Sequence, residues 1–191
     1  MSPFEVLRLI VSNLERLKIP YMVGGSFASS AHGVPRSTLD ADLIVDLKRQ
    51  DVGGLEEAFS RDFYMDIGQV EHALGSKRSF NLIHLETFFK ADLFVLRESS
   101  FAREEFSRRR LQPVESSVEA QIYVATPEDT VLSKLEWYRR GGEASENQWR
   151  DVIGIIKTQG GRLDLVYLRK WAVELGVSDL LEQASQEAGK V

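Results

Sequence analysis

The first 24 residues predict an amphipathic helix followed by a short strand. The apolar side chains that recur at the spacing of one helix face are Phe4, Leu7, Val11 and Leu14. A serine cap and a first-turn proline precede this stripe, and the helix is expected to end near Lys18, before Pro20. The apolar run at 21–23 then predicts a strand that ends at Gly24 and Gly25.

Residues 26–125 predict a mixture of short helices and strands. The small-residue segment 26–32 is expected to form a short helix, followed by a loop at 33–36. The clearest strand is 40–46, an apolar stretch bounded by acids. The other expected elements are a helix at 51–60, a strand near 63–65, a helical or loop segment to residue 77, a β-hairpin over 80–96 with its second strand at 90–96, a charged helix at 101–110 and a strand at 121–124.

From Thr126 onward the pattern predicts only helices. A threonine cap, a proline and two acids begin the first of them, which ends at Gly141. Further apolar stripes follow at 149–157 and 165–175, and Trp137, Trp149 and Trp171 are expected in the core. The fold class is therefore α/β (α+β), a mixed sheet flanked by helices. The expected domains are an α/β core at 1–125 and a helical C-terminal section at 126–191.

Composition excludes several functional classes. The 191 residues carry a net charge of −5 and no cysteine, which rules out disulfide scaffolds, thiolate metal sites and a cysteine nucleophile. The acidic balance argues against coating nucleic acid with bulk positive charge, so any such contact is local. No leader or membrane span is visible, and we expect a cytoplasmic protein that does not contact membranes.

The segment from Gly24 to Asp42 predicts a nucleotide site. Asp40 and Asp42 lie two apart in a strand and project to the same side, where two carboxylates repel unless a cation lies between them. Mg²⁺ is the ordinary cation for such a pair, held together with substrate phosphates. Gly24 and Gly25 permit close backbone approach, and Ser26 opens a helix whose N-terminus attracts anions.

Other polar residues extend this candidate site. Asp92, on a second strand, is a candidate ligand for a second metal ion in a two-metal arrangement. Lys90 points to the same side as Asp92 and is a candidate for neutralising phosphate charge, as is Lys134 on the helix after Thr126. Arg36, between the glycine turn and the Asp pair, is a candidate phosphate contact.

Gly-Gly-Ser followed by Asp-x-Asp and a later single Asp resembles the nucleotidyltransferase superfamily, whose fold is that of DNA polymerase beta. The segment GGSFASSAHGVPRSTLDADLIV is particularly similar to the AbiEii-type, toxin-like branch. Its Lys-x-Asp motif is matched by Lys90-Ala91-Asp92, and two later motifs are matched by Asp129 with Lys134 and by Arg150-Asp151. The resemblance covers about residues 20–157, but the lysine that often follows the last aspartate is missing here.

The resemblance implies Mg²⁺-dependent transfer of a nucleotidyl group from an NTP to an acceptor hydroxyl. Two Mg²⁺ ions would be held by Asp40, Asp42 and Asp92, and Asp92 would activate the acceptor. The residues expected to bind the nucleotide are Gly24, Gly25, Ser26, Arg36, Lys90 and Lys134.

The acceptor stays open at the level of sequence. The resemblance favours RNA, especially tRNA, and a toxin role beside an antitoxin protein. A small antibiotic-type acceptor, a protein acceptor and a non-catalytic nucleotide-binding module are the alternatives. The arginines at 97, 103 and 108–110 suggest either a solvated helix or a ridge that binds the acceptor. Asp151 is expected to be structural, paired with Arg150 or another cation.

Overall fold

The computed structural model describes residues 1–36, 38, 40–114 and 117–189, without the side chains of residues 114 and 117–120. The chain divides into two compact units, each built from two segments. The first unit contains residues 1–24 and 38–124, and the second contains residues 25–37 and 125–191.

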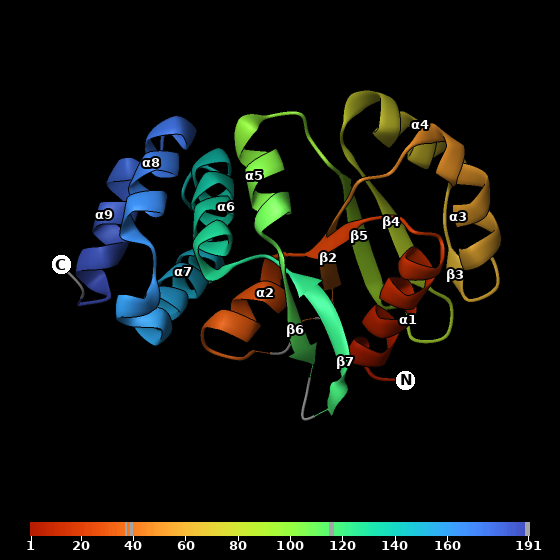
Figure 1. Cartoon of the computed structure of the whole chain (residues 1–191), viewed down its shortest axis with the longest axis horizontal. Helices are drawn as coiled ribbons and strands as arrows, with labels where there is room; N and C mark the ends of the chain where they lie inside the picture. Colours follow the sequence, from red (N-terminus) through yellow and green to blue (C-terminus); the bar gives the residue numbers. More distant parts are fainter. Residues whose placement is uncertain (37, 39, 115–116, 190–191) are drawn as a thin grey trace. The chain divides into compact units, whose positions relative to one another are not determined.

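Seven strands among the described residues form one mixed sheet in the first unit, in the order β3-β4-β5-β2-β1-β7-β6 (Figure 1). Two neighbouring pairs, β2 with β5 and β1 with β7, are parallel, and the other pairs are antiparallel. The strands are β1 (Tyr21–Val23), β2 (Asp40–Val45), β3 (Phe63–Tyr64), β4 (Ser79–His84), β5 (Lys90–Val95), β6 (Arg110–Val114) and β7 (Ser117–Val124).

One face of this sheet is closed by helices. Every second residue of β2, β4 and β5 is buried, while the alternating residues stay partly exposed, as expected for a sheet with one covered face. Helix α4 packs on β4 and β5, and α3 packs against α1 and α4. The helices of this unit are α1 (Pro3–Arg16), α3 (Val52–Phe59), α4 (Ile67–Ser76) and α5 (Ser100–Arg108), and a 3₁₀ turn (Arg49–Asp51) leads into α3.

The second unit is helical. Helix α2 packs against α6 and α7, and α8 packs against α6 and α9. Thr126, Ser145 and Asp164 cap α6, α7 and α8 with their side chains. The helices are α2 (Gly25–His32), α6 (Pro127–Arg140), α7 (Glu146–Gln159), α8 (Leu165–Leu175) and α9 (Ser178–Glu187), with a 3₁₀ turn (Gly160–Arg162) after α7.

His32 ends α2 as a buried, neutral side chain. Its Nε2 lies 2.6 Å from the Ala125 carbonyl, which can only accept, so Nε2 donates. Burial lowers the pKa of the imidazole because it disfavours the charged form.

The mixed sheet flanked by helices is confirmed, and most predicted elements lie where expected. The charged helix ends at Arg108, two residues early, because the chain enters edge strand β6, where Pro113 is tolerated. Strand β7 is longer than predicted, and α9 lies in the section predicted to be helical, although no apolar stripe marked it as a separate helix. The division at residue 125 stays a prediction; the structure adds that residues 25–37, inside the predicted first domain, group with the C-terminal helices.

The expectation that all three tryptophans lie in the core is wrong for Trp137. Trp171 is buried and Trp149 is half-buried, but 44% of Trp137 is exposed. The Arg140 guanidinium lies over the Trp137 ring at 5.9 Å, and this contact shields part of the ring at the surface.

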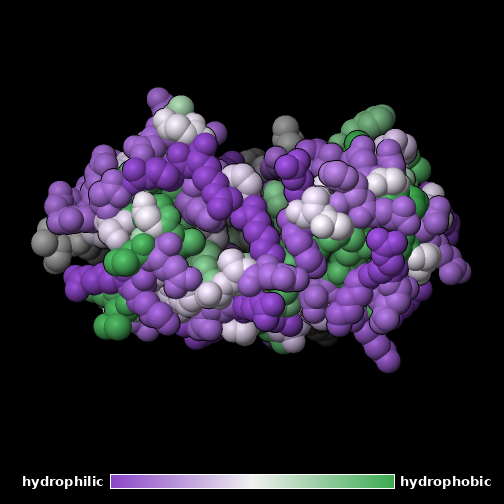
Figure 2. Space-filling view, turned by 90° about the horizontal axis from the view of Figure 1, so that it is seen from above, coloured by the Kyte–Doolittle hydropathy of each residue, from purple (hydrophilic) through white to green (hydrophobic). Residues whose placement is uncertain are grey.

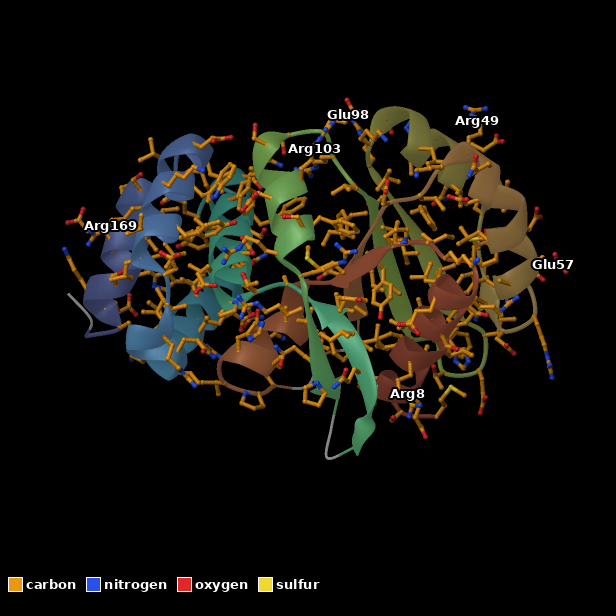
Figure 3. The ribbon with its side chains drawn as sticks, in the orientation of Figure 1. Arg8, Arg49, Glu57, Glu98, Arg103 and Arg169 are labelled. Atoms are coloured by element: carbon orange, nitrogen blue, oxygen red, sulfur yellow. The ribbon has the colours of Figure 1, made fainter. Side chains whose placement is uncertain are left out.

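Hydrophilic residues dominate the surface seen in Figure 2, and apolar residues are scattered between them. Charged side chains such as Arg49 and Glu57 point outward from the 3₁₀ turn and α3 (Figure 3). In the described part of the chain, no helix is both long and apolar enough to cross a bilayer.

Candidate active site

The three candidate carboxylates lie on the open face of the sheet in the first unit. Asp40 and Asp42 begin β2, whose opposite face is buried. Strand β5 runs parallel to β2, and the register sets Asp42 beside Asp92 and Asp40 beside Lys90. Side chains of paired residues on neighbouring strands point to the same face. The structure therefore brings Asp40, Asp42, Lys90 and Asp92 together as two neighbouring rows.

Two short-range contacts order this group. The Lys90 Nζ atom lies 2.9 Å from the Asp92 carboxylate, with 45% of the Lys90 side chain and 20% of the Asp92 side chain exposed. The Thr38 hydroxyl donates to Asp40 Oδ1 at 2.8 Å. The lysine offsets negative charge that would otherwise accumulate where Asp42 and Asp92 lie side by side.

The donor chemistry of this group fits Mg²⁺. This hard cation prefers oxygen ligands and is commonly held by one or two carboxylates together with phosphate oxygens and water. Among the described residues, no three acidic or histidine side chains converge as a ready metal cluster. The fit therefore rests on Asp40 and Asp42 with phosphate oxygens completing the ligand set, and the metal-binding roles of Asp40, Asp42 and Asp92 all stay predictions.

Gly24 lies at the end of β1, beside the carboxylates. Its amide donates to the Asp42 carbonyl at 2.9 Å. A Cβ atom at this position would meet Ile44 Cδ1 at 3.3 Å, so a side chain would crowd the face that carries Asp42. Gly25 follows with φ of +54°, a conformation that favours glycine, and begins α2.

A second polar group lies within the helical unit and is centred on Asp151. Arg36 forms a two-pronged contact with this carboxylate, Nε to Oδ1 at 3.1 Å and Nη2 to Oδ2 at 3.2 Å. Lys134 Nζ lies 2.8 Å from Oδ2, with only 8% of the lysine side chain and 6% of the aspartate side chain exposed. Arg36 Nη2 also donates to the Ser26 hydroxyl at 2.6 Å. Arg36 and Lys134, far apart in sequence, thus meet at one acid, and Ser26 joins the group through Arg36.

The two cations determine the protonation of Asp151. Burial of the carboxyl raises its pKa, but hydrogen bonds and charge from Arg36 and Lys134 outweigh that effect and leave the pKa below its ordinary value. Asp151 is thus ionised at neutral pH, and the group of two cations and one anion carries one net positive charge.

These contacts sharpen two assignments made from the sequence and add one residue to the group. Asp151 pairs with Arg36 and Lys134, and no feature of the local sequence indicates partners that are 115 and 17 residues away. Asp129 is fully buried and accepts hydrogen bonds from the Thr126 and Tyr167 hydroxyls. Gln148, whose Oε1 lies 3.5 Å from Lys134 Nζ, was not singled out by the sequence.

The arginines do not form one helical ridge. Arg103 projects from the first part of α5, just after Glu98 (Figure 3). Arg109 lies beyond the helix, where its guanidinium stacks on the rings of Phe106 and Tyr123, and Arg110 begins β6.

No protein-family model matches the sequence, and no curated protein matches it. Solved structures do resemble the fold. An antigenic nucleotidyltransferase-like protein from Paracoccidioides brasiliensis superimposes with a TM-score of 0.56 at 19% identity, covering 95% of this chain and 91% of that chain. The antibiotic-resistance factor ANT(2″)-Ia in complex with adenylyl-2″-tobramycin superimposes with a TM-score of 0.55 at 12% identity, covering 91% and 96%.

The chain has a nucleotidyltransferase-like fold. The likeness extends over nearly the whole length of both chains, so it includes the sheet with the carboxylates as well as the helical unit. At these identities it is a likeness of fold, and the AbiEii-type branch expected from the sequence stays a prediction. The nucleotidyltransferase-like fold is the framework on which the polar groups described above are placed.

Proposed function

We propose that the protein is a Mg²⁺-dependent nucleotidyltransferase, which moves an NMP from an NTP to an acceptor hydroxyl and releases pyrophosphate. The observation that carries this proposal is the row of Asp42 and Asp92, flanked by Asp40 and Lys90, on the open face of the sheet. Phosphoryl-group chemistry needs positioning and charge neutralisation more than reactive side chains, and this group supplies both.

Each residue has a proposed role. Asp40 and Asp42 would hold Mg²⁺, with Asp92 contributing to a second ion. The metal would supply Lewis-acid stabilisation of the charge that develops on the α-phosphate. Asp92 accepts the proton of the attacking hydroxyl, and Lys90, released from its contact with Asp92, neutralises phosphate charge.

The donor phosphates are assigned to the residues that follow β1. The tight turn at Gly24 and Gly25 allows backbone approach, and Ser26 lies in the first turn of α2, whose N-terminus favours anions. Arg36 and Lys134 are proposed as further phosphate ligands, because their shared contact with Asp151 leaves net positive charge.

We propose RNA as the acceptor, with tRNA favoured, and a cytoplasmic toxin of the AbiEii type paired with an antitoxin protein. The support is the motif series Gly-Gly-Ser, Asp-x-Asp and Lys-x-Asp in this sequence. A small antibiotic acceptor is the second candidate, favoured by the likeness to ANT(2″)-Ia, whose structure holds adenylyl-2″-tobramycin. A non-catalytic nucleotide-binding module is the third.

The test is label transfer from each α-labelled NTP with Mg²⁺, offered in parallel to total RNA, to an aminoglycoside and to the protein alone. We expect label in the RNA fraction, and its loss in the double variant Asp40→Asn/Asp42→Asn. The isosteric amides keep the shape of the site while removing its charge. Glu57→Gln, an exposed charge on α3, is the control and should transfer at the wild-type rate.

The outcomes separate the candidates. Label in the aminoglycoside alone would favour the antibiotic-type enzyme over the RNA enzyme. Binding of NTP without label in any acceptor, across all four nucleotides, would contradict the enzyme and favour the non-catalytic module.

A further inference from the structure

The open face of the sheet carries an aromatic residue in line with the carboxylates. Strand β3 is the edge strand next to β4, and 57% of Tyr64 is exposed. The register pairs Tyr64 with Ile83, Ile83 with Lys90, and Lys90 with Asp40. Paired residues share a face, so one row crosses four strands from an exposed aromatic ring to the first catalytic carboxylate.

The order of the strands sets the row from Tyr64 to Asp40 on one side of the α-phosphorus at which transfer would occur. Gly24, at the end of β1, contacts β2 on one side through the Asp42 carbonyl, while β5, β4 and β3 follow on the other side. If the donor phosphates bind at the glycine turn, the leaving pyrophosphate lies on the β1 side. In-line displacement sets the attacking oxygen opposite the leaving group, which is the side of Asp92 and Tyr64.

The chemistry of the row selects among acceptors. Beyond Lys90 it presents Ile83 and Tyr64, which are apolar and aromatic and carry no carboxylate. A polycationic antibiotic calls for acidic partners, whereas a nucleobase stacks on an aromatic face and its phosphate pairs with a cation. Three strand spacings of about 4.8 Å set Tyr64 roughly 14 Å from β2. This distance leaves room for a base near, but not at, the reacting end of the acceptor.

We propose that Tyr64 is a stacking residue for a base within the last few nucleotides of a single-stranded RNA acceptor, with Lys90, two strands further along the same row, as the phosphate contact. This inference rests on the proposed function and specifies its acceptor. Tyr64 is a positioning residue: it holds the acceptor in line and takes no part in the chemistry.

The experiment measures binding of a short single-stranded RNA with a free 3′ hydroxyl, by fluorescence anisotropy in the absence of metal. Tyr64→Ala should weaken RNA binding about tenfold, which corresponds to the loss of one stacked base, and Tyr64→Phe should restore it because the ring remains. The matched control is Leu85→Ala, which removes another exposed apolar side chain next to the same edge and should leave binding unchanged.

A second RNA, identical but abasic in its last three nucleotides, completes a double-mutant cycle. The wild type should bind this abasic RNA about tenfold more weakly than the intact RNA. Tyr64→Ala should bind the two RNAs with equal affinity. Equal losses for Tyr64→Ala and Leu85→Ala, or an unchanged affinity of Tyr64→Ala, would overturn the proposal. Weaker NTP binding in Tyr64→Ala with unchanged RNA binding would also overturn it and assign the ring to the donor base.

The two proposals fail in different ways. Label transfer by the wild type to a small acceptor and none to RNA would leave nucleotidyl transfer intact and remove the role of Tyr64. Tyr64-dependent RNA binding without label transfer to any acceptor would contradict the enzyme and leave the base-stacking site.

Discussion

At the scale of single residues, ion pairs within the protein organise both polar groups. Lys90 lies on Asp92, and Arg36 and Lys134 lie on Asp151. The first pair is partly exposed and contributes little to stability, whereas the second group is largely removed from water and depends on all of its partners. Mutating Lys90 and mutating Asp151 are therefore expected to affect the free energy of unfolding to different extents.

Replacing Lys90 should affect activity more than stability. A pair this exposed contributes about 0–1 kcal/mol to the free energy of unfolding, so Lys90→Met should unfold in urea close to the wild type. Loss of a phosphate-neutralising cation should lower the rate of label transfer by about 100-fold. Arg49→Met, on the exposed 3₁₀ turn, is the control. A fall in stability that matches the fall in rate would contradict this separation.

Replacing Asp151 should affect stability in a way that depends on pH. Asp151→Asn leaves the buried Lys134 cation without its carboxylate and should cost about 3 kcal/mol at pH 7. The folded protein holds the pKa of Asp151 below the ordinary 3.8, so its stabilising effect is present above that value and disappears as the pH falls below it. The difference between wild type and variant, measured by urea unfolding, should therefore narrow from pH 7 to pH 3. A difference that is constant with pH would contradict the assignment.

At the scale of elements, the loop after α2 packs on α7 through two glycines. A Cβ at Gly33 would lie 3.0 Å from Ile155 N and 3.1 Å from the Gly154 carbonyl carbon. A Cβ at Gly154 would meet the Val34 side chain at 3.4 Å. This contact holds the loop that carries Arg36 next to the helix that carries Asp151.

Gly33→Ala should therefore destabilise the protein by about 1–3 kcal/mol, because backbone atoms of α7 cannot move aside as a flexible side chain would. Gly53→Ala is a matched control: its Cβ would have nothing within 4 Å, and alanine favours the helix by up to about 1 kcal/mol. Thermal unfolding of both variants measures the contrast. Equal melting temperatures for the two would contradict close packing at Gly33.

The elements were predicted better than their long-range partners. The caps of α1 and α6 and the alternation in β2 and β5 are local signals, so these elements follow from the sequence. The pairing of Asp42 with Asp92 depends on which strands become neighbours, and the meeting of Arg36 with Asp151 depends on the packing of α2 on α7. The sequence did not mark Tyr64 as a candidate site residue. A single tyrosine in a two-residue strand can be placed beside the site only through the register of the sheet.

At the scale of the whole molecule, an acidic protein with a net charge of −5 is proposed to act on nucleotides and RNA. The arrangement of charge resolves this apparent conflict. Part of the acidity lies at Asp40, Asp42 and Asp92, where bound Mg²⁺ would reverse the local sign. The cations of the two polar groups are Lys90, beside Asp92, and the pair of Arg36 and Lys134 around Asp151. We therefore expect the protein to recognise a nucleic-acid end and not to coat a long strand.

The most direct test of nucleotidyl transfer follows two labels in one reaction. The protein, Mg²⁺ and RNA are incubated with an NTP labelled at the α-phosphate, and in parallel with the same NTP labelled at the γ-phosphate. The account predicts that the α label enters the acceptor, that the γ label leaves as pyrophosphate, and that Asp42→Asn stops both. Entry of the γ label into the acceptor, or retention of both labels in intact NTP with every acceptor offered, would contradict it.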